Sequence, residues 1–428
     1  MEKSELKQDP SFWRSSGIIF GVNNLHNVVN YTVLIFANYF LAQEFGAWVS
    51  ITALLSVALV PLNSFMAILS RKTSELTLID DKASFKYYFS IFTFLRKFLF
   101  TIILALPVIS ALVIWLMKVS YIDGILITLL FSITTVFAIN NNFLLGLIKV
   151  KEFSFTNLLT MLGRLVGVLI FLKLGFSLTS LPLGLGLGYL AGSISSFYFI
   201  HKLWKQVEHS SDQNSNQVFH FKDLAEVSQV MGMLVIMSLF LNADIILARV
   251  FFNDGLNQKY GIVSTFGQIA HFGSVSFTNI IIPFVARKSE KPILSYAIFL
   301  VIALSLSIIL IFAVFGSYLV KIFKGSEEAL TDIIIRYGFY ILFYNLVFIF
   351  INYLVAKNSY NVLKRLSLAA IGYILGLVGI GSSWSLFTVF GSGIEGFVNW
   401  NTLAAIVLSL GLFWEIQKAS KLESLSNH

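Results

Sequence analysis

Long apolar runs separated by short polar segments follow one another along almost the whole chain. A helix needs about 20 predominantly apolar residues to cross the hydrocarbon core of a bilayer, and twelve runs reach roughly this length. The pattern therefore predicts an all-α polytopic membrane protein with about twelve transmembrane helices. The predicted spans are 15–42, 46–70, 98–117, 121–146, 155–174, 180–203, 224–251, 260–286, 293–320, 331–356, 366–390 and 394–416.

Two of these spans carry nearly the same flanking residues about half a chain length apart. The first opens after Phe45-Gly46 and ends at Arg71-Lys72, and the second opens at Tyr260-Gly261 and ends at Arg287-Lys288. The two aromatic-glycine pairs are 215 residues apart in a chain of 428 residues. Internal repeats of this kind are typical of transporters, so the sequence favours a duplicated membrane bundle.

The duplication divides the chain into two predicted halves of six helices. The polar run from His209 to Gln217 lies near the midpoint and is expected to belong to a cytoplasmic linker. The predicted domains are an N-terminal six-helix bundle (1–203), the linker (204–222) and a C-terminal six-helix bundle (223–428). Because each half holds an even number of helices, both share one orientation. Their pseudo-two-fold axis is therefore expected along the membrane normal, with a cavity between the halves.

The distribution of charge sets the expected topology. The chain has 30 Lys and Arg against 22 Asp and Glu, a formal net charge of +8, 57% hydrophobic residues and a mean hydropathy of +0.82. With both termini placed in the cytoplasm, 22 of the 30 basic residues fall in inner segments and 6 in outer segments. This asymmetry follows the positive-inside rule, so the net charge reflects membrane orientation and does not indicate a nucleic-acid partner. The outer basic residues are Lys118, Lys173, Lys259, Lys321, Lys324 and Arg336.

The sequence lacks the motifs of several kinds of chemistry. There is no cysteine for a disulfide or a thiolate, and the six histidines show no metal-ligand spacing. No Walker A sequence occurs, so we expect no ATP hydrolysis. We also expect no cofactor and no enzymatic activity. The first dozen residues lack a cleavable signal pattern, so the first helix is expected to stay in the membrane. Residues 82–97 fit either a helix on the inner membrane surface or the irregular start of the next span.

Arg164 is the sharpest candidate for a functional side chain. It lies near the middle of the span 155–174, where an arginine costs about 2.5–3.5 kcal/mol on insertion scales and should face a cavity or a partner. A guanidinium binds phosphate through two parallel hydrogen bonds, which favours an anion contact. The alternative is a structural ion pair, or an arginine that reaches the membrane interface.

Two polar stripes accompany this arginine, one in each half. Asn23, His26, Asn27 and Asn30 lie three, four and seven residues apart, so they share one face of a helix. Amide and imidazole groups suit hydrogen bonding to sugar hydroxyls in a shared hydrophilic cavity, although the same groups also bridge membrane helices. The second stripe comprises Ser264, Gln268, His271, Val275 and Asn279.

Carboxylates inside the predicted spans are scarce. Asp244 lies deep in the span 224–251 and is a candidate for binding a coupling proton or cation, or for neutralising a cavity arginine. Arg249 lies about 140° further around the helix, so the two are not expected to pair, and Arg249 is expected to extend to the outer interface. Weaker cavity candidates are Asn140, Asn141, Asn142, Asn345 and Asn352, and Gly184, Gly188 and Gly192 are expected to allow close helix packing.

The segment Ala37-Asn-Tyr-Phe-Leu-Ala-Gln-Glu-Phe-Gly-Ala-Trp48 resembles the passage from the first to the second helix of polysaccharide-type flippases. These belong to the MOP superfamily, which includes Wzx O-antigen flippases, MurJ and the MATE exporters. Leu241-Asn-Ala-Asp-Ile-Ile-Leu-Ala-Arg249, followed by Tyr260-Gly261 and Pro283, resembles the start of the second half in this family. With twelve helices and a central linker, the resemblance covers essentially the whole chain. One departure is Asn38, where the family often has an arginine.

The resemblance implies a flippase that moves a polyprenyl-pyrophosphate-linked oligosaccharide, such as an O-antigen unit, across the cytoplasmic (inner) membrane by alternating access. Arg164 is then the candidate pyrophosphate contact, and the two polar stripes are the candidate glycan contacts. The lipid tail can remain in the bilayer. A coupling H⁺ or Na⁺ and glycan-assembly proteins are further candidate partners.

Other functions remain as alternatives. A proton- or sodium-coupled multidrug exporter of the same superfamily would need acidic cavity groups for cationic drugs, whereas Arg164 repels cations. A major-facilitator carrier would carry Gly-x-x-x-Asp and Gly-Arg-Arg elements, which are absent from the segment 70–75. A membrane-embedded glycan-processing enzyme usually has a large outer loop or acidic metal motifs, and neither is visible. The lipid II flippases are expected to use more intramembrane arginines, which argues against a peptidoglycan precursor.

Overall fold

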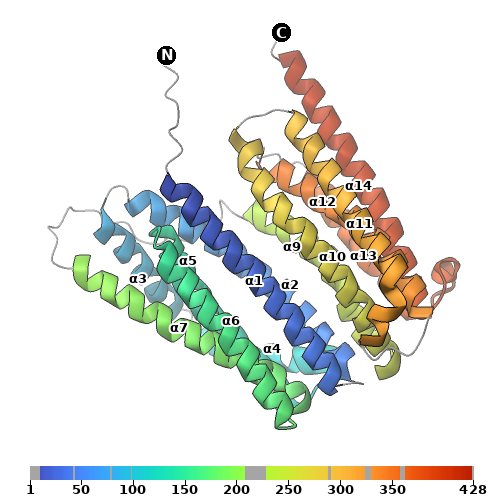
Figure 1. Ribbon diagram of the computed structural model, residues 1–428, viewed down its shortest axis with the longest axis horizontal. Helices are drawn as coiled ribbons and strands as arrows, with labels where there is room; N and C mark the ends of the chain where they lie inside the picture. The colour runs from blue at the N-terminus through green and yellow to red at the C-terminus, as the bar shows by residue number, and fades with distance from the viewer. Residues whose placement is uncertain are drawn as a thin grey trace. The chain divides into compact units, whose positions relative to one another are not determined.

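A computed structural model shows a helical membrane protein (Figure 1). The structure describes residues 10–41, 44–77, 80–97, 99–207, 228–287, 291–322, 329–356 and 362–426. Within these ranges there is no β-strand, and nine helices are long and apolar enough to cross a membrane, beside a shorter apolar helix at Ala105–Met117. The prediction of an all-α polytopic membrane protein is confirmed.

Each predicted span contains one helix, and 121–146 coincides with a helix at both ends. The helices up to the midpoint are α1 (Pro10–Leu41), α2 (Phe45–Thr77), α3 (Asp81–Lys97), α4 (Leu99–Met117), α5 (Tyr121–Gly146), α6 (Val150–Lys173), the short 3₁₀ helix η2 (Ser177–Thr179) and α7 (Ser180–Val207). Those after the midpoint are α9 (Ser228–Phe251), α10 (Asp254–Arg287), α11 (Lys291–Ile322), α12 (Ala329–Ala356), α13 (Leu363–Gly381), the 3₁₀ helix η4 (Ser385–Phe390) and α14 (Gly393–Ser426).

The predicted span 366–390 is too long at its carboxyl end, because α13 stops at Gly381. Ser383 adopts a left-handed conformation with φ of 57°. The Ser383 N–H donates to the carbonyl of Ile380, and the Trp384 N–H donates to the carbonyl of Gly379 at 2.8 Å. This is the Schellman arrangement that closes many helices, here with serine where glycine is usual. The absence of that glycine hid the helix end from the sequence.

The helices form two compact units. Unit 1 comprises Met1–Phe40, Leu62–Trp115 and Val119–Val227, and unit 2 comprises Leu41–Pro61, Leu116–Lys118 and Ser228–His428. The assignment changes within α2 at Pro61, a residue that cannot donate the usual helical hydrogen bond. The linker predicted at 204–222 begins inside α7, and its residues 208–222 lie outside the described ranges. The predicted domain boundaries and the symmetry between the halves therefore stay predictions.

In unit 1, α6 packs closely along α7 (Figure 1). A Cβ atom added at Gly167 would lie 3.0 Å from the Cα of Gly184, and one added at Gly163 would lie 2.9 Å from the Cα of Gly188. Side chains larger than hydrogen would therefore push the helices apart. The close packing expected from the glycine row of 184, 188 and 192 is confirmed, with a matching pair of glycines on α6.

The amphipathic segment 82–97 forms a helix of its own, α3. Its aromatic face is buried against other helices of unit 1, where Tyr88 stacks on Phe143 of α5 with ring centroids 4.3 Å apart. The hydroxyl of Tyr88 donates to Asn140 Oδ1 at 2.7 Å, and Asn140 Nδ2 donates to Ser196 at 3.2 Å. Asn140 is completely buried in these contacts. It therefore holds α3, α5 and α7 together, and the cavity role predicted for it is wrong.

In unit 2, α12 is the central helix and packs against α9, α10, α11 and α14. Tyr337, Tyr340 and Tyr344 lie three and seven residues apart on one face of α12, and all three are buried. Tyr340 and Tyr344 donate their hydroxyl hydrogens to the carbonyls of Phe240 and Met237 on α9. Buried phenols need such partners, so this stripe fixes α12 against α9.

The two aromatic-glycine pairs of the repeated element meet inside unit 2. A Cβ atom added at Gly261 of α10 would lie 3.0 Å from the Cα of Gly46 of α2. A Cβ atom added at Gly46 would collide with the carbonyl group of Asn257 and would lie 2.6 Å from the nitrogen of Gln258. The repeated glycines thus allow α2 and α10 to approach at backbone distance.

Replacing Gly46 with alanine is expected to destabilise the protein by about 1–3 kcal/mol, because the new methyl group meets backbone atoms that cannot rotate away. Gly186→Ala on α7 is the matched control, since nothing lies within 4 Å of a Cβ atom there. Thermal unfolding in detergent should show a lower midpoint for Gly46→Ala and no loss for Gly186→Ala. Equal midpoints for the two variants would contradict the close crossing of α2 and α10.

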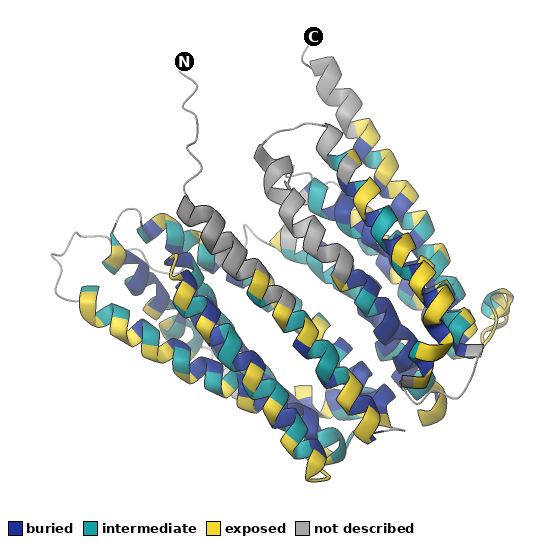
Figure 2. Ribbon diagram, in the orientation of Figure 1, coloured by how far each residue is buried: buried dark blue, intermediate teal, exposed yellow. Residues whose placement is uncertain are grey.

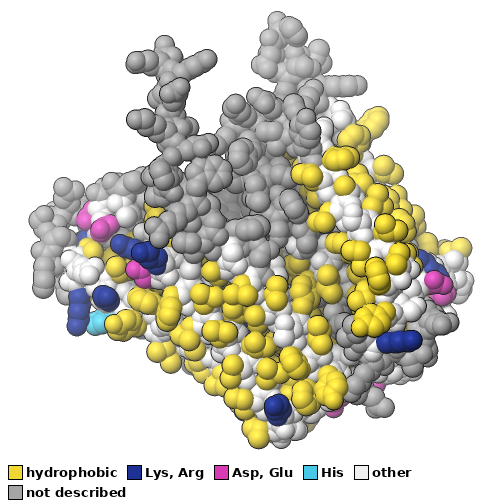
Figure 3. Space-filling view, in the orientation of Figure 1, with side chains coloured by type: hydrophobic (Ala, Val, Ile, Leu, Met, Phe, Trp, Pro, Cys, Tyr) yellow, Lys and Arg dark blue, Asp and Glu magenta, His cyan; other side chains and the backbone are white. Residues whose placement is uncertain are grey.

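The outer surface of the helices is apolar. Exposed leucine, valine, isoleucine and phenylalanine side chains follow α6, α7, α11 and α14, and exposed segments recur along these helices in Figure 2. In Figure 3 hydrophobic side chains cover much of the described surface, and the few charged side chains lie near its margins. A surface of this kind is expected where lipid, not water, surrounds the helices.

Candidate functional site

Arg164 lies on α6 and contacts the polar stripe of α1. Its Nη2 donates to Asn30 Oδ1 at 2.9 Å, and its Nη1 lies 3.3 Å from His26 Nε2. The guanidinium carbon also lies 5.4 Å from the ring centroid of Tyr189 on α7. An arginine only donates, so His26 accepts at Nε2 and carries its hydrogen on Nδ1. Three candidate residues from distant parts of the chain thus form one cluster in unit 1.

The charge of Arg164 is not neutralised within this cluster. Asn30, His26 as the acceptor and Tyr189 are all neutral, and among the residues described no carboxylate pairs with the guanidinium. The Nε atom is buried and has no hydrogen-bond partner in the described structure. Because an arginine has five N–H donors, donors remain for a further acceptor. Among the described residues, therefore, this side chain is held by neutral groups and not by the structural ion pair considered from the sequence.

A glycine on the neighbouring helix makes room for the arginine. A Cβ atom added at Gly188 would collide with the Cγ of Arg164 and would lie 2.6 Å from its backbone nitrogen. The glycine row of α7 therefore does more than bring two helices together, because it also sets where the Arg164 side chain leaves α6. Sequence reasoning identified Gly188 and Arg164 but did not connect them.

The rest of the α1 stripe is only partly visible. Asn27 is half-buried beside His26, whereas the side chain of Asn23 lies outside the described part of the structure. The cluster therefore contains Arg164, His26 and Asn30, with Asn27 one residue from His26 along α1.

The stripe of α10 in unit 2 is more buried. His271 is 4% exposed, and its Nδ1 lies 2.7 Å from Asn345 Oδ1 on α12. Asn345 in turn donates to Ser305 on α11 at 3.4 Å. These hydrogen bonds between side chains join α10, α12 and α11, as polar groups often do between membrane helices. Gln268 is half-buried, and the side chain of Asn279 lies outside the described residues.

Asp244 is the centre of a buried hydrogen-bond network in unit 2. Its Oδ2 accepts from the hydroxyls of Tyr260 and Tyr337 at 2.5 and 2.9 Å and from Asn401 Nδ2 at 2.8 Å. Its Oδ1 accepts from the backbone N–H of Ile245 at 2.9 Å. Asp244 itself is 0% exposed, so four donors stabilise the carboxylate where water cannot.

Sequence reasoning found Asp244 but missed the donors around it. Tyr337 belongs to the aromatic stripe of α12, which could have been recognised by its helical spacing. Asn401 on α14 offered no signal, because a single asparagine in a long apolar helix does not indicate which helix it faces. The network connects α9, α10, α12 and α14, which explains why unit 2 packs around α12.

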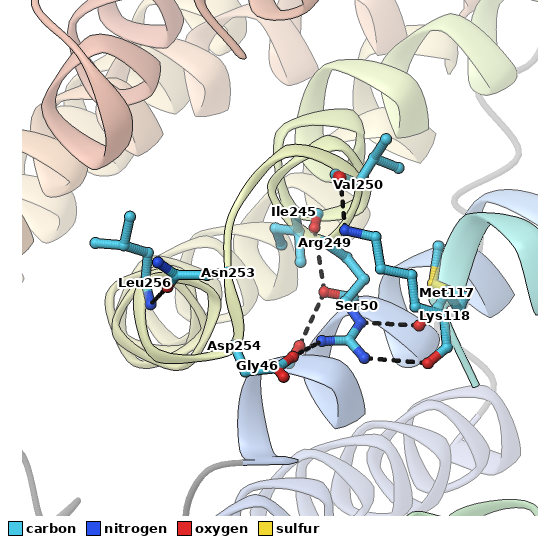
Figure 4. A network of polar contacts seen from close by, with 10 residues as sticks. All are labelled: Gly46, Ser50, Met117, Lys118, Ile245, Arg249, Val250, Asn253, Asp254 and Leu256. Carbon is cyan, nitrogen blue, oxygen red and sulfur yellow. Dashed lines mark hydrogen bonds and ion pairs between the residues drawn. The ribbon is translucent and has the colours of Figure 1, made fainter. Parts of the chain in front are cut away.

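Arg249 lies in the last turn of α9, and its predicted extension to the outer membrane interface stays a prediction. It is 7% exposed, and its Nε donates to the carbonyl of Met117 at 2.8 Å, while Nη2 approaches the carbonyl of Lys118 at 3.3 Å. Its Nη1 pairs with Asp254 at 2.5 Å, and Lys118 Nζ donates in return to the carbonyl of Val250 at 2.7 Å (Figure 4). Free carbonyls at a helix end attract cations, which explains why the side chain turns inward. As expected, Arg249 and Asp244 bind different partners.

Comparison with known proteins identifies the fold. No protein-family model matches the sequence, and no curated protein matches it. Among solved structures, an inward-facing multidrug resistance MATE transporter of the MOP superfamily superposes with a TM-score of 0.65 at 15% identity, covering 91% of this chain and 95% of the other. The chain has the fold of MOP-superfamily transporters.

Two further structures show how widely this fold is used. The lipid II flippase MurJ in an inward closed conformation has a TM-score of 0.66 at 13% identity, covering 92% of this chain and 87% of its own. A MOP-superfamily transporter from Pyrococcus furiosus has a TM-score of 0.63 at 14% identity, covering 94% of both chains. At these identities the similarity establishes the shared fold, and the site residues have to be argued from their own chemistry.

Proposed function

We propose that this protein is a flippase that moves a polyprenyl-pyrophosphate-linked oligosaccharide across the cytoplasmic membrane. The observation that supports this most is the guanidinium of Arg164, which lies inside a membrane-spanning unit with neutral partners and, among the described residues, without a neutralising carboxylate. A positive charge inside the membrane is costly, and an anion that binds to it lowers this cost. The pyrophosphate is the anion of such a substrate.

The neighbouring groups suit the sugar part of the same substrate. Asn30 and His26 hold the guanidinium at one side, and the half-buried amide of Asn27 lies on the same face of α1. Amides donate and accept, so they can bind hydroxyl groups of many geometries. The lipid tail needs no site of its own, because it can stay in the bilayer while the halves rock between two conformations.

The solved structures of the same fold support transport as the general function. Their descriptions include a lipid II flippase and a multidrug resistance transporter. The Pyrococcus furiosus protein is described by a reverse polarity of its binding pocket that suggests a different function. For the present chain, the positive charge at Arg164 likewise disfavours a pocket for cationic drugs and favours an anionic substrate.

A coupled multidrug exporter is the second candidate, and Asp244 is the observation in its favour. A buried carboxylate can carry a coupling proton or a sodium ion. However, the two carboxylate oxygens of Asp244 already accept four hydrogen bonds. Cation binding would therefore require Tyr260, Tyr337 or Asn401 to move. We therefore assign Asp244 to the architecture of unit 2 and keep ion coupling as the role it would have in the second candidate function.

Transbilayer movement of a fluorescent polyprenyl-pyrophosphate oligosaccharide in proteoliposomes tests the proposal. We expect the purified protein to accelerate this movement over protein-free vesicles, and not to export a cationic dye under a proton or sodium gradient. Dye export without oligosaccharide movement would show that the protein is a multidrug exporter and not a flippase. Vesicles that contain an unrelated polytopic membrane protein control for leakage at the protein–lipid boundary.

A further inference from the structure

A groove with a volume of about 480 Å³ lies on unit 2 between α13 and α14. Its volume is within the range of about 300–1,000 Å³ that is usual for sites of small ligands. The two helices run antiparallel here, because Arg365 of α13 contacts Glu415 of α14 and the Nε1 of Trp400 donates to the carbonyl of Tyr373 at 2.9 Å. The groove therefore runs along the first part of α13 and the middle of α14.

The groove has a rigid floor and an open rim. Tyr373 forms part of the floor, is 2% exposed and stacks on Phe240 of α9 with ring centroids 4.7 Å apart. At the rim, Val407 and Trp414 are 62% and 72% exposed. Apart from its charged end, the lining is apolar, so water gains little by entering it whereas a hydrocarbon chain buries its surface.

Two glycines shape the groove from opposite sides. Gly372 of α13 and Gly411 of α14 both line it, and a Cβ atom added at either would meet nothing within 4 Å. Other glycines in unit 2, such as Gly376 and Gly267, instead face a side chain at close range. The space above Gly372 and Gly411 is therefore not filled by the described residues.

One end of the groove is charged. Arg365 and Glu415 both line it there, and the side chain of Arg365 is 67% exposed although it pairs with Glu415. Lys364 and Lys418 are exposed close by in sequence, at the same ends of α13 and α14, so basic side chains outnumber acidic ones among those described at this end. Trp414 lies next to Glu415, as is usual for tryptophan at the boundary between hydrocarbon and headgroups. The charged end therefore lies at the membrane interface, on the side predicted to be cytoplasmic.

From these features we propose that the groove binds one phospholipid of the bilayer, with an acyl chain along Tyr373, Gly372 and Gly411 and an anionic headgroup at Arg365. Along α14 the groove extends from Trp400 to Glu415, which is about 22 Å of helix at 1.5 Å per residue. One leaflet contributes about 15 Å of hydrocarbon, so the groove is long enough to hold an acyl chain that starts at the interface across the whole leaflet. This site is separate from the Arg164 cluster and does not depend on the proposed function.

A bound acyl chain would also contact Tyr373, which is hydrogen-bonded through Asn401 to Asp244. The hydroxyl of Tyr373 donates to Asn401 Oδ1 at 3.0 Å, and Asn401 Nδ2 donates to Asp244 Oδ2. The ring that forms the floor of the groove is thus one step from the central network of unit 2. A lipid packed on this ring restrains Tyr373 and, through Asn401, the carboxylate.

Native mass spectrometry of protein released from nanodiscs tests the proposal. The nanodiscs contain phosphatidylglycerol and phosphatidylcholine with the same acyl chains. We expect one retained phospholipid, with phosphatidylglycerol preferred about fivefold because one basic group near the surface contributes about that factor. Gly411→Phe should reduce retention about tenfold or more, since the ring occupies the place of the acyl chain. Arg365→Gln should remove the preference for phosphatidylglycerol.

Matched variants separate a loss of the site from a loss of folding. Leu410→Phe adds the same aromatic ring one residue away on an exposed face of α14 and should retain the lipid like the unmodified protein. Gly372→Phe fills the groove from α13 and should act like Gly411→Phe, with unchanged thermal unfolding. Unchanged retention in both glycine variants would overturn the proposal. Displacement of the phospholipid by a polyprenyl-pyrophosphate oligosaccharide would also overturn it, since the groove would then belong to the transport substrate.

Discussion

Replacement of Arg164 with alanine should slow the movement of a polyprenyl-pyrophosphate oligosaccharide about 100-fold. Removal of one partner from a buried pair of charged groups costs about 2–5 kcal/mol, and each 1.4 kcal/mol corresponds to a factor of ten. Because Arg164 is only partly buried, we use the lower part of this range. The contacts of Arg164 with Asn30, His26 and Tyr189 are to neutral groups, so the fold should tolerate the change. Proteoliposome flipping rates and thermal unfolding of the same preparations measure both effects.

Two variants make this result specific to the guanidinium. Arg164→Lys keeps the charge but loses the planar fork, so we expect a rate between those of the native protein and Arg164→Ala. Leu162→Ala removes an exposed apolar side chain from the same helix and should leave the rate unchanged. If Arg164→Ala moves the oligosaccharide at the native rate, Arg164 has a structural role and does not bind the substrate. Loss of movement in Leu162→Ala as well would show that the assay reports damage to α6.

The helices of this protein could be predicted from the sequence because each one has to cross a hydrocarbon layer of fixed thickness. Every predicted span contains a helix, and the ends of 121–146 match α5. The repeated aromatic-glycine pairs were also visible, and their glycines allow the close contact between α2 and α10. What could not be predicted is that the start of α2 belongs with the helices of unit 2, because a single apolar helix carries no local signal for its neighbours.

In the candidate site, too, the sequence indicated the residues but not their contacts. His26, Asn30 and Arg164 were recognised separately as polar groups in apolar spans, but only the structure brings them to within hydrogen-bond distance. The contacts of Arg249 could not be predicted, because two of its partners are the backbone carbonyls of Met117 and Lys118, more than 130 residues away in the sequence. Backbone groups are present at every position, so a sequence cannot show which of them lack a partner.

Asp244→Leu is expected to be the most destabilising substitution considered for unit 2. It leaves the hydroxyls of Tyr260 and Tyr337 and the amide of Asn401 without their acceptor in a site that water does not reach. Each unsatisfied buried donor costs about 1–3 kcal/mol, so a total loss above about 3 kcal/mol is expected even if the donors find partial replacements. Thermal unfolding in detergent and the yield of folded protein should both fall strongly.

Tyr337→Phe is the matched control, because it removes one donor and leaves the carboxylate with the other three. Its expected cost is about 1 kcal/mol, the usual net value of one hydrogen bond. Asp244→Asn should lie between the two variants, since an amide keeps one acceptor but sets its own N–H groups against the donors of Tyr260 and Asn401. If Asp244→Leu is as stable as Tyr337→Phe, the carboxylate does not organise unit 2. In that case its burial would have to be explained by ion coupling, and the gradient dependence of transport in Asp244→Asn would become the decisive measurement.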